Sequence, residues 1–214
     1  MWHPEAITGA LEGTLRDLGR EPALGAFYLA GGTGLALHLG HRRSGDLDFF
    51  AVERFDEDEL LQRIQHISGF AVTSKAPGAL HTVIQETKVS FCQYVYPVLF
   101  PFAAFLGVKI ADVPDIACMK LSAIASRGTK RDFIDLYTVA KQLGLDQQLQ
   151  LFNRKYAQAA CSMVHVLKCL TYFEDAEKDP MPHLLASISW DEVKRFFRSE
   201  APRLLSMAVR PVAE

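Results

Sequence analysis

Two aspartates are the residues best suited to chemistry in this 214-residue chain. Asp46 and Asp48 lie in residues 46–52, whose composition predicts a β-strand. Side chains alternate along a strand, so both carboxylates are expected on one face while Leu47 and Phe49 point to the core. Paired acids repel each other, and a bound divalent cation relieves that repulsion. The pair therefore predicts a metal site in which Asp46 and Asp48 bind Mg²⁺ or Mn²⁺.

A glycine pair precedes the acids. Residues 27–30 predict a short apolar strand that ends at Gly31 and Gly32, and Thr33 is placed to cap a helix over about 33–39. Glycines leave backbone N–H groups uncovered at a helix N-terminus, where a phosphate binds readily, and the Thr33 hydroxyl adds a donor. We therefore expect Gly31, Gly32 and Thr33 to bind the phosphates of an NTP whose oxygens the metal bridges.

Two other nucleotide-binding motifs fail on this stretch. A Walker A loop needs a lysine directly after its last glycine, but Gly34 is followed by Leu35. A dinucleotide fingerprint needs a glycine or alanine three positions after Gly34, and Leu37 stands there. The order of strand, glycine turn, helix and acidic strand therefore favours displacement at phosphorus, in which positioning and charge stabilisation dominate.

The elements that must position these residues fall into two halves. The first half is rich in strands, whereas the pattern from Val113 onward is helical, with Gly128, Gly144, Pro180 and Pro182 as punctuation. We expect an α+β (α/β) protein in which a mixed β-sheet flanked by helices (1–110) is followed by a helical bundle (111–214). The further elements predicted in the first half are a helix over 3–19, a helix capped by Asp56, and strands near 69–75, 80–86 and 88–95, the last two joined by a tight turn near Thr87.

Composition excludes several classes of protein. With 49% hydrophobic and 22% charged residues, the chain is neither disordered nor fibrous, and its net charge of −2 gives no global positive field for nucleic acid. Residues 89–108 carry no charge over about the length of a membrane-spanning helix. Pro97 and Pro101 would break such a helix, so we expect a buried strand that runs into a loop and no membrane span. The four cysteines form no CxxC pair and no basic leader begins the chain, which predicts a reduced, cytoplasmic protein.

Two blocks of sequence resemble a known family. The elements GGT, HRRS and DLDFF within residues 27–50 resemble the nucleotidyltransferases of the AbiEii/AbiGii toxin family, which belong to the DNA polymerase β-like superfamily. The stretch VPDIACMKLSAIASRGTKRDFIDLY, residues 113–137, resembles the family's second region. The resemblance implies a nucleotidyltransferase fold and transfer of an NMP from an NTP to an acceptor hydroxyl. It also implies a toxin of a bacterial toxin–antitoxin or phage-defence pair, with tRNA as an acceptor and an antitoxin protein as partner.

The second block supplies further candidates for the site. Lys120 is expected to neutralise the NTP phosphates, and Asp132 to act as a base or to orient the acceptor. Asp132 and Asp135 are expected to point away from the core; alternatively, they pair with neighbouring basic residues as an ion network that fixes the helix. Arg43 and Arg127 are expected to bind the nucleotide as members of a basic rim, and Lys130 taken alone is expected to be solvated. The rim consists of Arg42, Arg43, Arg127, Lys130 and Arg131.

One position departs from the superfamily pattern, which often places a third carboxylate on a later strand. That strand reads ETKVSFC here, with Ser90 at the expected position and Glu86 as the nearest carboxylate on the same face. Three alternatives remain open: Glu86 or Asp132 substitutes, one metal suffices, or catalysis has been lost. The last would leave a catalytically degenerate module that binds nucleotide or protein, and a small-molecule acceptor is a further alternative.

A cysteine and histidine series in the second half resembles zinc ligands only superficially. Cys161, His165 and Cys169 share one helical face, but they are spread over about 12 Å of helix. Three ligands so far apart cannot all reach one ion. We therefore expect these residues to pack rather than to bind metal.

Overall fold

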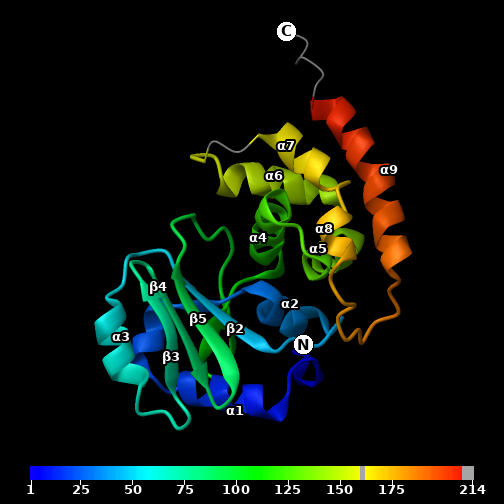
Figure 1. Ribbon diagram of the computed structural model, residues 1–214. Coiled ribbons are helices and arrows are strands. Elements are labelled where there is room, and N and C mark those ends of the chain that lie inside the picture. Colours follow the sequence, from blue (N-terminus) through cyan, green and yellow to red (C-terminus); the bar gives the residue numbers. More distant parts are fainter. Residues whose placement is uncertain (160–161, 209–214) are drawn as a thin grey trace. The chain divides into compact units, whose positions relative to one another are not determined.

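The computed structural model describes residues 1–159 and 162–208, apart from the side chains of Met207 and Ala208 (Figure 1). The chain divides into two compact units, Met1–Ile116 and Ala117–Glu214. The division falls inside helix α4 (Val113–Ser126).

The first unit is built on a mixed sheet whose strand order is β3-β4-β5-β2-β1-β7-β6 (Figure 1). Strand β2 pairs in parallel with β5, and β1 pairs in parallel with β7, whereas the other neighbours are antiparallel. The predicted mixed sheet is therefore confirmed. The strands are β1 (Tyr28–Leu29), β2 (Asp46–Ala51), β3 (Ala71–Ala76), β4 (Ala79–Ile84), β5 (Thr87–Gln93), β6 (Ala103–Phe105) and β7 (Val108–Ile110).

The turn between β4 and β5 lies earlier than predicted. Gln85 and Glu86 form it, with φ angles of 48° and 68°, and β5 begins directly afterwards at Thr87. Both residues occupy the left-handed region, so strand alternation does not extend back to Glu86. Glu86 therefore does not share the face of Ser90 by strand alternation, and that prediction was wrong.

The uncharged segment 89–108 is not a helix. It contains most of β5, a connecting loop with Pro97 and Pro101, strand β6 and the first residue of β7. The hairpin of β6 and β7 was not predicted from the sequence. Within the described residues, no helix has both the length and the apolar character needed to cross a membrane.

Helices pack on one face of the sheet and create the core of the first unit. Helix α1 (Gly9–Leu18) contributes Leu11, Leu15 and Leu18, and α3 (Glu57–Ile64) contributes Leu60 and Ile64. They bury the strand residues that point to them, which are Leu47, Phe49, Leu80, Ile84, Val89 and Phe91. Burial of these apolar side chains is the main force that fixes the sheet against its helices.

Capping residues set where these helices begin. The helix predicted over 3–19 is divided into a short 3₁₀ helix, η1 (Pro4–Ala6), and α1, because the Thr8 hydroxyl accepts a hydrogen bond from the Leu11 N–H and starts a new helix. Asp56 caps α3 as predicted, since its carboxylate accepts from the N–H groups of Asp58 and Glu59. A second 3₁₀ helix, η2 (Pro22–Ala26), leads into β1.

The second unit is helical, as predicted. Helix α5 opens with a capping box, in which the Thr129 side chain accepts from the Asp132 N–H and the Asp132 side chain accepts from the Thr129 N–H. The rings of Phe133, Phe173, Trp190 and Phe197 meet around α5 with centroid separations of 5.0–5.9 Å. The helices after α4 are α5 (Lys130–Leu143), α6 (Leu145–Lys155), α7 (Met163–Cys169), α8 (Glu174–Glu177) and α9 (Trp190–Ala208).

Candidate active site

The acid pair lies where the strand pattern placed it. Along β2, Leu47 and Phe49 are fully buried, whereas Asp46 and Asp48 are partly accessible on the opposite face. This alternation confirms that both carboxylates project from one side of the strand. We call that side of the sheet, which also carries Ser90 and His81, the acid face.

The glycine pair forms the first turn of helix α2 (Gly31–Leu39), which begins two residues earlier than predicted. Its N-cap is Ala30, whose N–H donates to the Asp48 carbonyl at 3.0 Å. Ala30 has no polar side chain, so the first backbone N–H groups of α2 receive no side-chain cap. They therefore remain suited to an anion, whose charge the positive end of the helix favours.

Gly31 brings the helix and the acid pair into contact. Its φ angle is +63°, and a Cβ atom placed there would lie 2.8 Å from Asp48 Oδ2. A larger residue would meet both the left-handed backbone penalty and the carboxylate. The close approach of helix N-terminus and carboxylate therefore depends on glycine at this position.

Gly32 faces an arginine. A Cβ atom at Gly32 would lie 2.6 Å from Arg42 Nη2 and 3.3 Å from Ser44 Oγ. Arg42 is 2% exposed and donates from Nη1 to the Arg43 carbonyl at 3.0 Å, whereas the Arg43 side chain is exposed. Of the two neighbouring arginines, Arg42 thus lies against the glycine turn, whereas Arg43 was the one predicted to bind the nucleotide.

Thr33 has a structural use that the sequence did not reveal. It is not the N-cap, and its side chain is 1% exposed. Its hydroxyl donates to the Asp46 carbonyl and lies 2.8 Å from the Ser44 hydroxyl. These contacts tie α2 to the start of β2, so the prediction that Thr33 caps the helix was wrong.

In the second unit, Lys120 lies between two buried carboxylates. Its Nζ is 2.8 Å from Asp132 Oδ1 and 2.7 Å from Asp135 Oδ2, and all three side chains are at most 9% exposed. The expectation that the acids point away from the core was therefore wrong. The alternative, an ion network, is correct, but the acids pair with Lys120 rather than with Arg127, Lys130 or Arg131.

Within the ion trio of Lys120, Asp132 and Asp135, the pKa of Asp132 is lowered. Burial by itself raises that pKa, but the charge of Lys120 and hydrogen bonds from Lys120 and Thr129 outweigh the effect of burial. The Asp132 oxygens are both engaged, Oδ1 by Lys120 and Oδ2 by the Thr129 hydroxyl at 2.6 Å. Asp132 is thus an ionised, weakly basic group that holds Lys120.

The other members of the predicted basic rim take different positions. Lys130 is 6% exposed, its backbone N–H donates to Asp179 Oδ2 at 2.9 Å, and its Nζ donates to the carbonyls of Glu177 and Asp179. It is therefore a buried structural residue and not a solvated one. Arg127 and Arg131 are exposed near the junction of α4 and α5.

The position of the third carboxylate is occupied by a hydroxyl. Ser90 on β5 pairs in register with Asp48 on β2, so the two side chains share the acid face. Glu86 is exposed in the turn before the strand. Ser90 instead contacts His81 on β4, whose Nδ1 lies 3.0 Å from the Ser90 Oγ.

The oxygen-rich acid pair fits a hard cation. Within residues 1–159 and 162–208, no group of three or more His, Cys, Asp or Glu side chains is arranged to hold a metal alone. Two carboxylates suit Mg²⁺, which takes oxygen ligands and usually completes its shell with water and substrate phosphates. Cys161 lies outside the described residues, while His165 contacts the Ala125 carbonyl and the Cys169 sulfur.

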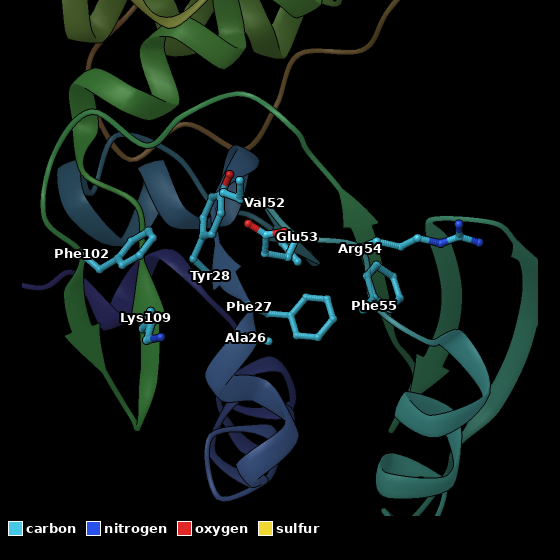
Figure 2. Close-up of a pocket in the computed structure, with 10 residues that line it drawn as sticks. Ala26, Phe27, Tyr28, Val52, Glu53, Arg54, Phe55, Phe102 and Lys109 are labelled. Carbon is cyan, nitrogen blue, oxygen red and sulfur yellow. The ribbon is translucent and has the colours of Figure 1, made fainter.

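A cavity of about 220 Å³ opens at the end of β2 (Figure 2). The Tyr28 and Phe102 rings stack along one wall with centroids 5.1 Å apart, and Lys109 Nζ lies 6.0 Å from the Phe102 centroid. Tyr28 pairs with Phe50, two residues beyond Asp48 on the same side of β2. The cavity lining consists of Ala26, Phe27, Tyr28, Ala51, Val52, Glu53, Arg54, Phe55, Phe102 and Lys109.

Comparison with known proteins decides the family. Residues 14–208 match the family model described as nucleotidyl transferase AbiEii toxin, type IV TA system. The chain belongs to this family. It is therefore a nucleotidyltransferase, and the resemblance found in the sequence is confirmed.

Several relatives extend the comparison. An uncharacterised protein of Aquifex aeolicus (strain VF5) is 37% identical over 185 residues, which cover 84% of this chain and 88% of that protein. Among solved structures, MenT4, a nucleotidyltransferase toxin of Mycobacterium tuberculosis H37Rv, aligns with a TM-score of 0.53 at 18% identity over 95% of this chain and 90% of its own. JHP933 of Helicobacter pylori gives 0.53 at 17% identity over 96% and 91%.

A more distant structural match is ANT(2″)-Ia, solved with adenylyl-2″-tobramycin. Its TM-score is 0.50 at 13% identity, over 69% of this chain and 94% of that chain. At these identities the structural matches establish a shared fold. AbiEii-family membership and the nucleotidyltransferase fold are thus consistent with each other.

We expect Gly31→Ala to destabilise the protein by at least about 1–2 kcal/mol, because alanine is penalised in the left-handed region and its Cβ meets Asp48. Urea denaturation measures this change in the free energy of unfolding. Gly45→Ala is the matched control, since a Cβ there meets nothing within 4 Å. Equal stabilities of the two variants would show that the close approach is not a constraint.

We expect Lys120→Met to lower the free energy of unfolding by about 3–5 kcal/mol at pH 7, because it removes a cation from between two buried carboxylates. The pKa of Asp132 is lowered in the folded protein, so its stabilising contribution is present above its ordinary value of 3.8 and is lost as pH falls through the folded pKa. The difference between wild type and variant should therefore shrink below about pH 4.

Urea denaturation from pH 7 to pH 3 measures this dependence. Lys178→Met provides the control, because the Lys178 side chain is 77% exposed in its ion pair with Asp175. We expect this replacement to change the free energy of unfolding little at any pH, because solvent screens an exposed ion pair. A Lys120→Met penalty that stays constant with pH would contradict the ionised trio.

Proposed function

We propose that this AbiEii-family nucleotidyltransferase transfers an NMP from an NTP to an acceptor hydroxyl and releases pyrophosphate, with Mg²⁺ or Mn²⁺ held by Asp46 and Asp48. The observation that carries the proposal is the contact of Gly31 with Asp48, since a Cβ at Gly31 would lie 2.8 Å from the carboxylate. This contact supports the proposal, because a helix N-terminus, which favours phosphate, lies directly beside two carboxylates, which favour a hard cation.

In this proposal, one set of residues in the first unit binds the phosphates and another binds the cation. The N–H groups at the start of α2, from Gly31 to Thr33, bind phosphate oxygens, and the Arg42 guanidinium beside Gly32 adds positive charge. Asp46 and Asp48 hold the cation, which when bound neutralises charge that develops on the triphosphate. Because α2 and β2 are fixed by Thr33 and the core, these groups are ordered before substrate arrives.

Lys120, Asp132 and Arg127 complete the proposal from the second unit. We assign to Lys120 the neutralisation of the triphosphate and to Arg127 a contact with the nucleotide, as the family motif suggests. The contacts of Asp132 with Lys120 and Thr129 favour a role in positioning that lysine. They do not favour Asp132 as a base, because the same contacts lower its pKa.

For the acceptor we propose tRNA, in which an unstacked base enters the cavity at the end of β2. Aromatic rings are platforms for single-stranded bases, and cations at the rim contact the backbone phosphates. Phe102 stacks on Tyr28 and is 39% exposed, and Lys109 and Arg54 line the same cavity. The family further suggests a toxin whose activity a cognate antitoxin protein restrains.

Incubation of the purified protein with total tRNA and each α-labelled NTP tests the transfer. We expect label in tRNA and release of pyrophosphate that depend on Mg²⁺ or Mn²⁺. Asp46→Asn and Asp48→Asn should each reduce the rate at least about 100-fold, because each removes an ionised ligand of the cation.

Asp58→Asn is the matched control for these variants. Asp58 is an exposed aspartate paired with Lys75, and its replacement should leave the rate of transfer unchanged. Transfer that persists in both acid variants, or in EDTA, would refute the assigned site. NTP binding without a divalent ion and without pyrophosphate would instead favour a nucleotide-binding module that lacks catalysis.

We expect Phe102→Ala to raise the KM for tRNA about 5- to 150-fold, because base stacking on an aromatic side chain contributes about 1–3 kcal/mol. The affinity for NTP, measured by calorimetry, should not change. Tyr172→Ala serves as control, since Tyr172 is an aromatic residue 50% exposed in the second unit. An unchanged KM would exclude the cavity as the base-binding site.

A further inference from the structure

Three polar side chains lie in a row across the sheet. Asp48 on β2 is paired in register with Ser90 on β5, and Ser90 is paired in register with His81 on β4. Residues paired in register on neighbouring strands project from the same face. The row therefore runs from the proposed cation ligand, through a hydroxyl, to an imidazole.

Burial places the whole row on the acid face. On β4, Leu80 and Thr82 are buried while His81 between them is partly accessible, and on β5 the buried residues Val89 and Phe91 flank the partly accessible Ser90. The apolar neighbours point to the core with Leu47 and Phe49 of β2. Ser90 and His81 thus share the side of the sheet that carries Asp46 and Asp48.

The hydroxyl and the imidazole are within hydrogen-bond distance. His81 Nδ1 lies 3.0 Å from Ser90 Oγ. In the imidazole tautomer that carries its proton on Nε2, Nδ1 accepts the Ser90 hydroxyl proton. Ser90 then keeps a lone pair with which it accepts another proton, as a relay requires.

Other ionisable groups on this face are poorly suited to accept a proton. Lys88, opposite Asp46, is exposed and cationic, and the Cys92 thiol has its pKa raised by burial and by the negative charge of Asp48. Strands β3 and β5 are the neighbours of β4 in the sheet, and β3 contributes Ser74 opposite His81. Asp46 and Asp48 are assigned to the cation.

We propose that His81, acting through Ser90, is the proton acceptor that activates the acceptor hydroxyl. This inference rests on the proposed function. The acceptor oxygen forms a bond to the α-phosphorus as the bond from that phosphorus to the pyrophosphate oxygen breaks. The acceptor proton passes to Ser90 Oγ while the Ser90 proton passes to His81 Nδ1, so His81 ends the step as imidazolium.

The pair would supply what the third carboxylate supplies elsewhere. A serine hydroxyl alone is too weak a base to hold the proton, but a hydrogen-bonded imidazole makes it a competent relay. Replacement of Ser90 by aspartate should therefore make His81 unnecessary, because a carboxylate at that position accepts the proton directly.

The test measures kcat for transfer from α-labelled NTP to total tRNA across a range of pH. We expect His81→Gln and Ser90→Ala each to lower kcat about 100-fold or more, with little change in the KM for NTP, and the double variant to be no worse than either. We expect Ser90→Asp to restore most of the rate in the His81→Gln background. It should also move the acid limb of the profile to lower pH, because a carboxylate titrates below an imidazole.

A spectroscopic measurement separates this role from a structural one. The protonation of His81, followed by NMR of its imidazole in the wild-type protein, should coincide with the acid limb of kcat. His66→Gln is the matched control, since His66 is a surface histidine beside Glu21 and its replacement should change neither rate nor pH profile. Thermal unfolding of each variant checks that the sheet is intact.

The outcomes distinguish this inference from the proposed function. If wild-type protein transfers label but folded His81→Gln retains its rate, or Ser90→Asp fails to rescue it, the relay is refuted and the function stands. An NMP found covalently on Ser90 by mass spectrometry would also refute the relay, because Ser90 would be a nucleophile. If wild-type protein shows no transfer, the proposed function fails and the relay with it.

Discussion

The close approach of the Gly31 backbone to the Asp48 carboxylate is the constraint on which the candidate site depends. It joins the positive end of a helix to a strand that carries two negative side chains, and it leaves no room for a Cβ atom between them. The Ala30 N–H bonded to the Asp48 carbonyl and the Thr33 hydroxyl bonded to the Asp46 carbonyl hold the two elements in register. The site is thereby ordered by contacts that do not themselves involve a ligand.

The hydrophobic core determines which side chains face this site. Burial of Leu47 and Phe49 on β2, and of Val89 and Phe91 on β5, fixes the orientation of both strands. A shift of register by one residue would expose these side chains and bury the acids, so the apolar residues enforce the polar arrangement. The same alternation carries Ser90 and His81 to the acid face, although neither belongs to the family's acidic motif.

In the second unit, two buried carboxylates fix the position of the Lys120 ammonium group. Lys120 is held by Asp132 and Asp135, and the Thr129 hydroxyl engages the second oxygen of Asp132. A buried ion network of this kind is costly to desolvate and tolerates little change in geometry. Asp132 therefore has two roles: it completes the capping box of α5 and it orients Lys120.

The sequence by itself determined the acid pair, the glycine turn, the strand-rich and helical halves and the family, because these depend on local alternation, helix signals and contiguous motifs. Tertiary structure decided the rest: Arg42 rather than Arg43 against Gly32, the hydroxyl of Thr33 turned to β2, Lys120 between two acids, and His81 beside Ser90. Local periodicity indicates which way a side chain points from its own element. It does not specify which distant residue lies opposite, because strand pairing and helix packing are set by contacts between segments far apart in the chain.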